Sequence, residues 1–320
     1  MFELDKLTKY KDWLTFKSFV RQHFIEQGLT EVETPTLVEG PAFEAYLEVF
    51  TTHWEWGGRQ SSFCLPTSPE ISIKKLIASG WNNLFEIKNC FRNNELSPTH
   101  EPEFQMLEWY RVGDKLELLV NDIQLLFNKL TENNWIKGEC LQLKTVSMAE
   151  VFYESVQFKL TPQTTREELV DLSMSLGLDP EGGETREELF DWVFVHKIEE
   201  TLKQNHPIIL HSYPPWMPTL AKTNEQGWAE RFELYFRGYE LANAFNELLN
   251  YEEHERRWLE ICNIRIAQKL PPLTKDQQFF EFIKNDLPPT LGIALGLDRL
   301  FLAIQNHKNI SDFKVFAKFI

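Results

Sequence analysis

The chain has 320 residues, which is enough for one large domain or two ordinary ones and excludes a small disulfide-stabilised protein. Hydrophobic residues make up 42% of the chain and charged residues 25%, a composition typical of folded proteins rather than disordered ones. The 33 basic and 48 acidic side chains give a net charge of −15, which argues against non-specific binding to a nucleic-acid backbone.

The first predicted elements are a long helix, an extended segment and a second helix. Apolar residues recur every three or four positions from Leu7 to Gln27, and Gly28 follows as a stop, so we expect one amphipathic helix. The segment VETPTLVEG combines β-branched residues with Pro35, which predicts a strand at an edge or interface of a sheet. In TSPEISIKKLIASG, Ser68 can cap a helix and Gly80 can end it.

Residues 84 to 111 are predicted to form a β-hairpin. LFEIK and EFQMLEWYRV have the composition of strands, and the polar segment NNELSPTHEP between them is typical of a loop. In the second strand, Phe104, Met106, Glu108 and Tyr110 alternate onto one face.

The stretch from about 112 to 205 is predicted to be mainly helical, with TREEL at Thr165 and Thr185 as two capping boxes. ERFELYFRGYELANAFNELL then predicts a hairpin around Gly238, YEEHERRWLEICNIRIAQKL a helix, and GIALGLDRLFLAIQN a strand followed by a helix. Strands near both ends with helices between them favour an α+β fold around an antiparallel sheet. No linker divides the chain, so we expect one domain over residues 1–320.

The cysteines and the apolar segments indicate the cellular setting. Cys64, Cys90, Cys140 and Cys262 lie far apart with no C-x-x-C pair, so neither a zinc site nor a disulfide framework is expected. No segment approaches the roughly 18 apolar residues of a membrane span, and the amino terminus lacks the apolar core of a signal peptide. We therefore expect a cytoplasmic protein that does not enter a membrane.

Two arginines are candidate ligands for an anion. Arg92 lies where a strand enters the polar loop, and its guanidinium can hold a pair of phosphate oxygens, although a surface ion pair is the plainer interpretation. Arg299 falls in the first turn of a helix, after Gly292 and Gly296, where the helix dipole disfavours a positive charge. This position indicates an anionic partner, with the neighbouring Asp298 as the structural alternative.

The order of these motifs resembles the three signature motifs of class II aminoacyl-tRNA synthetases. The long helix with VETPTL is similar to motif 1, FEIKNCFR and HEPEFQMLEWY to the strands of motif 2, and GIALGLDRL to motif 3. TSPE and RFELYFRGYELANAFNEL resemble the lysine-specific branch. Because the chain begins almost directly at the motif 1 helix, we expect no OB-fold anticodon domain. The chain therefore resembles the elongation factor P β-lysyltransferases, which are paralogues of lysyl-tRNA synthetase.

The resemblance implies a class II catalytic core, with an antiparallel sheet flanked by helices, that acts as an ATP-dependent ligase. Such an enzyme activates (R)-β-lysine or lysine as an acyl-adenylate, with ATP and Mg²⁺, and transfers it to a lysine side chain of elongation factor P. We expect a homodimer, because motif 1 pairs two protomers in this class, and tRNA is not the expected acceptor. Two alternatives stay open: a compact synthetase-like enzyme with an RNA or small-amine acceptor, and a catalytically silent regulatory subunit.

The resemblance also implies an ATP site. Arg92 would contact the α-phosphate and Arg299 the γ-phosphate, as the catalytic residues, and Glu233 and Glu240 would hold magnesium. The remaining ATP-binding positions are Asn94, Glu95, His100 and Phe104, the last of which would stack on adenine. The motif usually has glutamate where this chain has Asn94, which motivates the silent-subunit alternative.

The implied amino-acid pocket comprises Ser68, Glu70, Glu108, Tyr110, Asn243, Phe245, Glu247 and Ala294. Glu247 is expected to bind the side-chain amine of the substrate, since a buried ammonium group needs a carboxylate to offset its desolvation. Ala294 and Ser68 stand where the lysine synthetases have glycine and alanine. We expect Ala294 to crowd the α-amino position of ordinary lysine and to leave room for an amine on the β-carbon.

Overall fold

The structure is a computed structural model that describes residues 3–138, 141–217, 219–285 and 287–317. Its strands are β1 (Thr30–Glu31), β2 (Thr51–Trp56), β3 (Arg59–Cys64), β4 (Leu84–Phe91), β5 (Glu103–Val112), β6 (Lys144–Ser147), β7 (Ile208–Tyr213), β8 (Ala229–Phe236), β9 (Tyr239–Asn246) and β10 (Thr290–Gly296). Its α-helices are α1 (Leu4–Glu26), α2 (Glu70–Ala78), α3 (Glu117–Glu132), α4 (Met148–Val156), α5 (Arg166–Ser175), α6 (Arg186–Val193), α7 (Tyr251–Ala267), α8 (Gln277–Asn285) and α9 (Leu297–Gln305).

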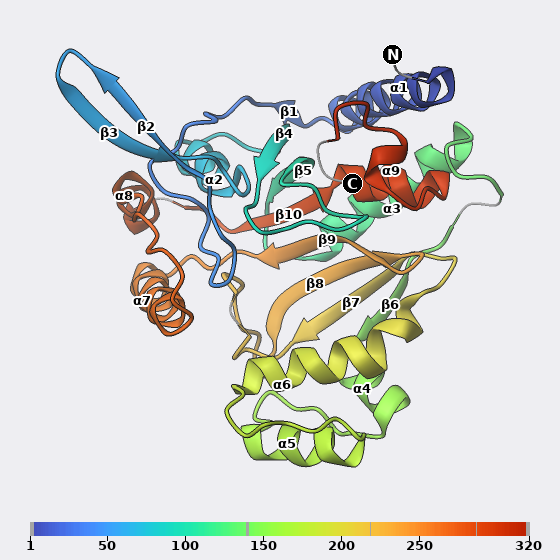
Figure 1. The fold of residues 1–320 in the computed structure, drawn as a ribbon, viewed down its shortest axis with the longest axis vertical. Coiled ribbons are helices and arrows are strands. Elements are labelled where there is room, and N and C mark those ends of the chain that lie inside the picture. The colour runs from blue at the N-terminus through green and yellow to red at the C-terminus, as the bar shows by residue number, and fades with distance from the viewer. Residues whose placement is uncertain (1–2, 139–140, 218, 286, 318–320) are drawn as a thin grey trace.

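An eight-stranded sheet in the order β1-β4-β5-β10-β9-β8-β7-β6 organises the molecule (Figure 1). The outermost pairs, β1 with β4 and β6 with β7, are parallel, and the strands between them pair antiparallel. Helices α5 and α6 lie beyond the β6–β8 end of the sheet, and the β2–β3 hairpin projects from the body on the side of α2 (Figure 1). The expected α+β class with a mainly antiparallel sheet is confirmed.

The two faces of the central strands differ in polarity, because successive side chains of a strand point to opposite faces. On one face, Trp109 and Ile293 belong to the largest apolar core, which they share with Trp13 of α1, Phe127 of α3 and Phe301 of α9. The residues between them along each strand face the other way and are often polar or small. The same sheet therefore supplies a core on one face and a polar surface on the other.

Most of the predicted elements are confirmed. The long helix, the β4–β5 and β8–β9 hairpins, helix α7 and the β10–α9 unit all form near the predicted residues. Both TREEL segments form complete capping boxes, in which the hydroxyls of Thr165 and Thr185 accept from the backbone N–H of Glu168 and Glu188. Helices also predominate in 112–205, with β6 as one short strand among them.

The prediction of a strand over VETPTLVEG is wrong. Strand β1 covers only Thr30–Glu31 and ends before Pro35. The reason is that Thr34 binds a side chain instead of a neighbouring strand: its N–H and its hydroxyl donate to the two carboxylate oxygens of Glu86, at 3.0 and 2.8 Å. The chain therefore leaves the sheet edge here, and Val38 makes only an isolated bridge.

Five of the strands and α-helices were not predicted: β2 and β3, which form a hairpin, β7, α8 and the short β6. The hairpin had a usable signal, since Gly57 and Gly58 both adopt positive φ, at 58° and 77°, as a two-residue turn between strands requires. Of the cysteines in the described part of the chain, Cys64, Cys90 and Cys262 are free, while Cys140 lies outside the described residues. None of the described helices combines the length and the apolarity that a bilayer span needs.

Trp13 tests the core that joins α1 to the sheet. It is 2% exposed, and its ring lies 5.3 Å from that of Phe301 and 5.4 Å from that of Phe313. We predict that Trp13→Ala lowers the free energy of unfolding by about 3–5 kcal/mol, because it leaves a large cavity. Trp56→Ala, at a side chain that is 71% exposed, should change it by no more than about 0.5 kcal/mol in the same urea titration. Equal losses in both variants would contradict this assignment of the core.

Candidate active site

The polar face of the sheet forms the floor of a cavity of about 300 Å³. Strand β10 contributes the small residues Gly292, Ala294 and Gly296 to the lining, together with Ile293, which belongs to the core. Ala294 pairs in register with Glu108 on one side and Asn243 on the other. Small residues on the middle strand and larger ones on both neighbours produce a trough along β10.

The cavity brings together fourteen of the sixteen predicted site residues, from segments that span most of the chain. They are Ser68, Glu70, Arg92, Glu95, His100, Phe104, Glu108, Tyr110, Glu240, Asn243, Phe245, Glu247, Ala294 and Arg299. The predicted ATP-binding and amino-acid-binding groups therefore share one continuous space.

One end of the cavity is rich in guanidinium groups. Arg92 lies over the ring of Phe104, at 5.2 Å, and reaches the Glu95 carboxylate only at 3.7 Å; its buried Nε has no hydrogen-bond partner in the described structure. Arg299 donates to the Glu240 carbonyl, at 3.0 Å, and to Nε2 of His100. Burial and the charge of Arg299 lower the pKa of His100 to about 4, so the imidazole is neutral at pH 7 and accepts this bond.

The structural alternative for Arg299 does not hold, because Asp298 is committed elsewhere. Its Oδ2 accepts from the backbone N–H of Gln105, at 2.8 Å, and from Lys314 Nζ, at 2.6 Å. The two arginines thus present positive charge to the cavity with little carboxylate compensation. Such an end suits a phosphate or another oxyanion.

The opposite end of the cavity is acidic. Glu108 Oε1 accepts from the hydroxyl of Tyr110, at 2.7 Å, while its buried Oε2 has no hydrogen-bond partner in the described structure. Burial raises the pKa of Glu108 well above its ordinary value. Glu70 and Glu247 lie nearby, joined by the ammonium group of Lys74 at 2.5 and 2.6 Å. This end suits a ligand with amino groups.

Two predicted residues, Asn94 and Glu233, are not in the lining of this cavity. Asn94 is exposed at a φ of 60°, and its amide donates to the Glu48 carboxylate beside a neighbouring groove. Glu233 is buried beside the cavity, on the same face of the sheet as its cross-strand neighbour Asn243, and it accepts from Arg231 and from the Tyr235 hydroxyl, the latter at 2.8 Å. Its carboxylate is therefore already paired with a cation.

Glu240 is the better candidate of the two expected magnesium ligands. It lines the cavity beside Arg299, and burial together with the charge of Glu233 raises its pKa to about 7. A divalent cation would relieve this repulsion between carboxylates. The described residues contain no cluster of three or more protein ligands. That fits Mg²⁺, which usually takes one or two carboxylates and completes its shell with phosphates and water.

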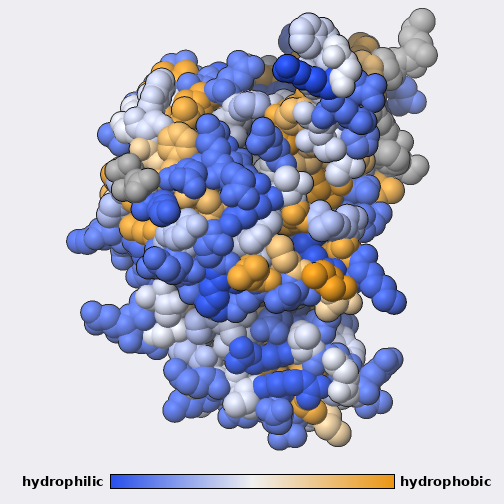
Figure 2. All heavy atoms as spheres, turned by 90° about the vertical axis from the view of Figure 1, so that its left-hand side faces the viewer, coloured by the Kyte–Doolittle hydropathy of each residue, from blue (hydrophilic) through white to orange (hydrophobic). Residues whose placement is uncertain are grey.

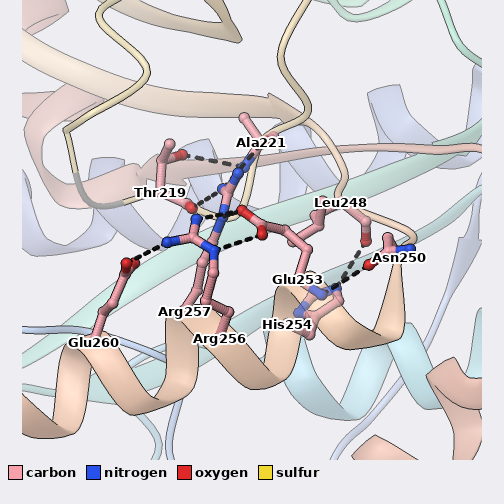
Figure 3. Close-up of polar contacts among 9 residues, drawn as sticks. All are labelled: Thr219, Ala221, Leu248, Asn250, Glu253, His254, Arg256, Arg257 and Glu260. Atoms are coloured by element: carbon pink, nitrogen blue, oxygen red, sulfur yellow. Dashed lines mark hydrogen bonds and ion pairs between the residues drawn. The ribbon is translucent and has the colours of Figure 1, made fainter.

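Helix α7 fastens two loops of the cavity wall through the half-buried Arg257 and the buried Arg265. Arg257 donates to the carbonyls of Thr219 and Ala221, the latter at 3.0 Å (Figure 3). Arg265, 1% exposed, donates to three carbonyls of the 44–47 segment at 2.7–3.3 Å. Both loops contribute lining residues to the cavity. The position of this wall therefore depends on α7.

Sequence reasoning missed Lys74, Arg231 and the α7 arginines. Lys74 had a signal, because it follows Glu70 by four residues on a helix, the spacing at which side chains of opposite charge meet. Arg265 had none, since its acceptors are backbone carbonyls about 220 residues earlier in the chain. Only the folded structure brings these groups together.

Comparison with known proteins identifies relatives over nearly the whole chain. The family described as tRNA synthetases class II (D, K and N) matches residues 10–319. An elongation factor P–(R)-β-lysine ligase from Haemophilus influenzae (strain PittGG) is 33% identical over 303 residues, covering 93% of this chain and 91% of the relative. Proteins of the same name from Histophilus somni (strain 2336) and Enterobacter sp. (strain 638) are 34% and 31% identical, covering 92% and 93% of this chain and 90% and 91% of theirs.

Gly292 tests the shape of the trough. A methyl group at this position would overlap the Tyr110 ring and the Glu247 carboxylate, whereas at Gly296 the nearest atoms would lie 3.8 Å away. We predict that Gly292→Ala lowers the free energy of unfolding by about 1–3 kcal/mol through overpacking. The matched Gly296→Ala variant should unfold close to wild type in the same titration. If both variants lose the same stability, the space above β10 is not as tight as the structure indicates.

Proposed function

Because the chain belongs to the class II tRNA synthetase family, and within it to the elongation factor P–(R)-β-lysine ligases, we propose that it activates (R)-β-lysine, or lysine, and transfers it to a lysine side chain of elongation factor P. As a member of this family it is an ATP-dependent ligase. The observation that carries the proposal for the substrate is the polarity of the cavity, which has an arginine-rich end and an acidic end above one continuous floor.

The arginine-rich end is the proposed ATP site. Arg92 would bind the α-phosphate and Arg299 the γ-phosphate, with His100 and Glu95 beside them and Phe104 as a stacking surface for adenine. Support comes from the two guanidinium groups that line this end of the cavity and from the Phe104 ring under Arg92. We leave Asn94 out of this site, because its amide donates to the Glu48 carboxylate and Asn94 lines a neighbouring groove instead of this cavity.

The acidic end is the proposed amino-acid site. Glu70, Glu108 and Glu247 would surround the amino groups of the substrate, and Asn243 and Phe245 would form the wall on β9. The proposed floor is Ala294, with Ser68 and Tyr110 beside it. This arrangement directs the substrate carboxylate toward Arg92, where it would meet the α-phosphorus.

The proposed chemistry proceeds in two steps. The substrate carboxylate oxygen attacks the α-phosphorus of ATP, the bond to the β-phosphate oxygen breaks, and pyrophosphate leaves. The acceptor amine then attacks the carbonyl carbon of the acyl-adenylate, loses a proton and releases AMP. Arg92 and Arg299 would stabilise the negative charge that develops in the first step. A magnesium ion on Glu240 would supply further positive charge to the phosphates, with Glu233 as a second carboxylate behind it.

The acceptor and the oligomeric state rest on the relatives rather than on the cavity. Relatives that cover more than nine tenths of this chain are named for elongation factor P and (R)-β-lysine. The homodimer stays a prediction. The strand with Pro35 that it would involve does not form, and the chain just before it, in β1, lies at an edge of the sheet.

Pyrophosphate exchange tests the proposed activity directly. The purified chain should exchange labelled pyrophosphate into ATP when (R)-β-lysine or lysine is present, and not without an amino acid. Incubation with elongation factor P or with tRNA then identifies the acceptor, and we expect label on the protein. A chain that folds but exchanges nothing would support a silent subunit, and label on tRNA would support a synthetase.

Arg92 and Arg299 are predicted to be essential for adenylate formation. Each alanine variant should lower pyrophosphate exchange by at least about 100-fold, since removal of one charge-stabilising donor typically has an effect of this size. Arg256→Ala is the control, because Arg256 is 55% exposed and pairs with Glu253 and Glu260 on the surface of α7 (Figure 3). Near-normal exchange in a folded Arg92 or Arg299 variant would remove that arginine from the mechanism.

Ala294 is predicted to control the choice between the two lysine isomers. It lies between Glu108 and Asn243 on the cavity floor, where one methyl group decides how close an α-amino group can come. Ala294→Gly should raise kcat/KM for α-lysine relative to (R)-β-lysine by roughly 10- to 200-fold, the usual range for one carbon in a pocket. If the ratio of the two kcat/KM values does not change, the steric explanation is wrong.

A further inference from the structure

The acidic end of the cavity contains a lysine of the protein itself, at a place where the substrate is expected to bring its own ammonium group. The Lys74 side chain is 0% exposed, and its Nζ lies 2.5 Å from Glu70 Oε1 and 2.6 Å from Glu247 Oε2. Glu70 and Glu247 both line the cavity, but Lys74 is not in its lining. The ammonium group therefore supports the two carboxylates from behind, without filling the space in front of them.

We propose that Lys74 is a positioning residue, which aligns the Glu70 and Glu247 carboxylates so that together they attract one substrate ammonium group. Two carboxylates and one ammonium group leave one net negative charge and two carboxylate groups for the ligand. Without Lys74, two buried like charges would face each other, and one of them would take up a proton. The net charge would then be the same, but only one carboxylate would be left to accept from the substrate ammonium group. This inference rests on the proposed function, since it concerns how the same site recognises its amino-acid substrate.

The surrounding groups make an internal cation necessary. Burial alone would lower the pKa of Lys74, but Glu247 and Glu70 outweigh it and raise this pKa above its ordinary value, so Lys74 stays charged. Burial raises the pKa of Glu247 to about 7, with Lys74 acting against burial and Glu70 with it. The other titratable groups that act on these three are Glu44 before β2, Glu108 and Tyr110 on β5, Lys222 before β8, and His254 on α7.

None of these neighbours can replace the Lys74 charge. Burial lowers the pKa of His254 to about 4, so it is neutral at pH 7, and its Nε2 bonds to the Leu248 carbonyl at 2.8 Å (Figure 3). Glu108 and Tyr110 are an acid and a phenol, and cannot neutralise a carboxylate. The charge of Lys222 affects the Glu247 carboxyl less than the charges of Lys74 and Glu70 do. Lys74 is thus the cation that sets the charge of this end of the cavity.

Three variants measured by pyrophosphate exchange at pH 7 and pH 9 test the proposal. Lys74→Met should lower kcat/KM for (R)-β-lysine at least tenfold at pH 7, and by less than threefold at pH 9, where the carboxylates ionise again. Glu70→Gln should lose activity at both pH values, because Glu247 and Lys74 then cancel. The double variant Lys74→Met/Glu70→Gln keeps one carboxylate without a cation to cancel it and should exceed Glu70→Gln at least tenfold at pH 7.

The control is Lys9→Met, which breaks an ion pair of the same spacing between Asp5 and Lys9, at 2.6 Å but on the exposed surface of α1. It should leave kcat/KM and its pH dependence unchanged. A role of Lys74 in packing alone would lower activity by the same factor at both pH values, and adding Lys74→Met to Glu70→Gln would then not raise the activity. Either result would overturn the proposal. If Lys74→Met does not fold, the comparison of the double variant with Glu70→Gln decides: equal activity contradicts the charge balance.

A measurement without substrate separates this inference from the proposed function. Glu247 has a raised pKa of about 7 in the wild type, and without the charge of Lys74 this pKa lies higher still. Both proteins lose stability up to about pH 7, but only folded Lys74→Met continues to lose it above that pH, so its stability falls relative to wild type as the pH rises from 7 to 9. In urea unfolding, the gap between the two midpoints should widen over this range, while that of Lys9→Met stays constant. A widening gap in a protein that exchanges no pyrophosphate would keep the charge balance and reject the proposed function. A constant gap in an active enzyme would reject the role of Lys74.

Discussion

The site depends on one constraint, the alternation of side chains along the central strands. On β10, every second residue from Gly292 to Gly296 is small and faces the cavity, while Leu291, Ile293 and Leu295 between them are buried in the core. A larger side chain on the cavity face would fill the trough, and a polar one on the other face would enter the core without a partner. Strand β10 thus provides both apolar packing for the core and open space for the cavity.

The charges of the cavity follow from the same geometry. Arg92 and Arg299 lie where β4 ends and α9 begins, so their guanidinium groups meet at one end of the trough, while Glu108 on β5 and Glu247 after β9 lie at the other. Because the two ends of the cavity carry opposite charges, one end would bind a substrate with amino groups and the other a nucleotide with phosphates. The same charges would bring the carboxylate of the substrate to the phosphate of the nucleotide.

Seen from the side of α7 and the β2–β3 hairpin, the molecule is mainly hydrophilic, with hydrophobic residues in separate patches (Figure 2).

The walls of the cavity are held by cations that bond to the backbone and to carboxylates inside the protein. Arg257 and Arg265 fasten loops through their carbonyls, and Lys74 joins Glu70 to Glu247. Buried cations of this kind are stable only when every donor has an acceptor, which fixes the position of each acceptor in turn. A chain with a net charge of −15 therefore uses several of its 33 basic residues in its interior, to shape a site.

The sequence by itself determined the elements whose signals are local. The capping boxes at Thr165 and Thr185 and the alternation of β5, β9 and β10 depend on residues a few positions apart. The resemblance to the class II synthetases implied the sixteen site residues, of which fourteen line one cavity. Tertiary structure decided the rest. Glu86 bound Thr34, where the predicted strand does not form, Glu48 accepted from the Asn94 amide outside the cavity, and Arg231 bound Glu233. Lys74 met Glu247, 173 residues away. A buried charge is paired with whichever group the fold brings close to it. Which group this is cannot be predicted from the separation of the two residues along the sequence.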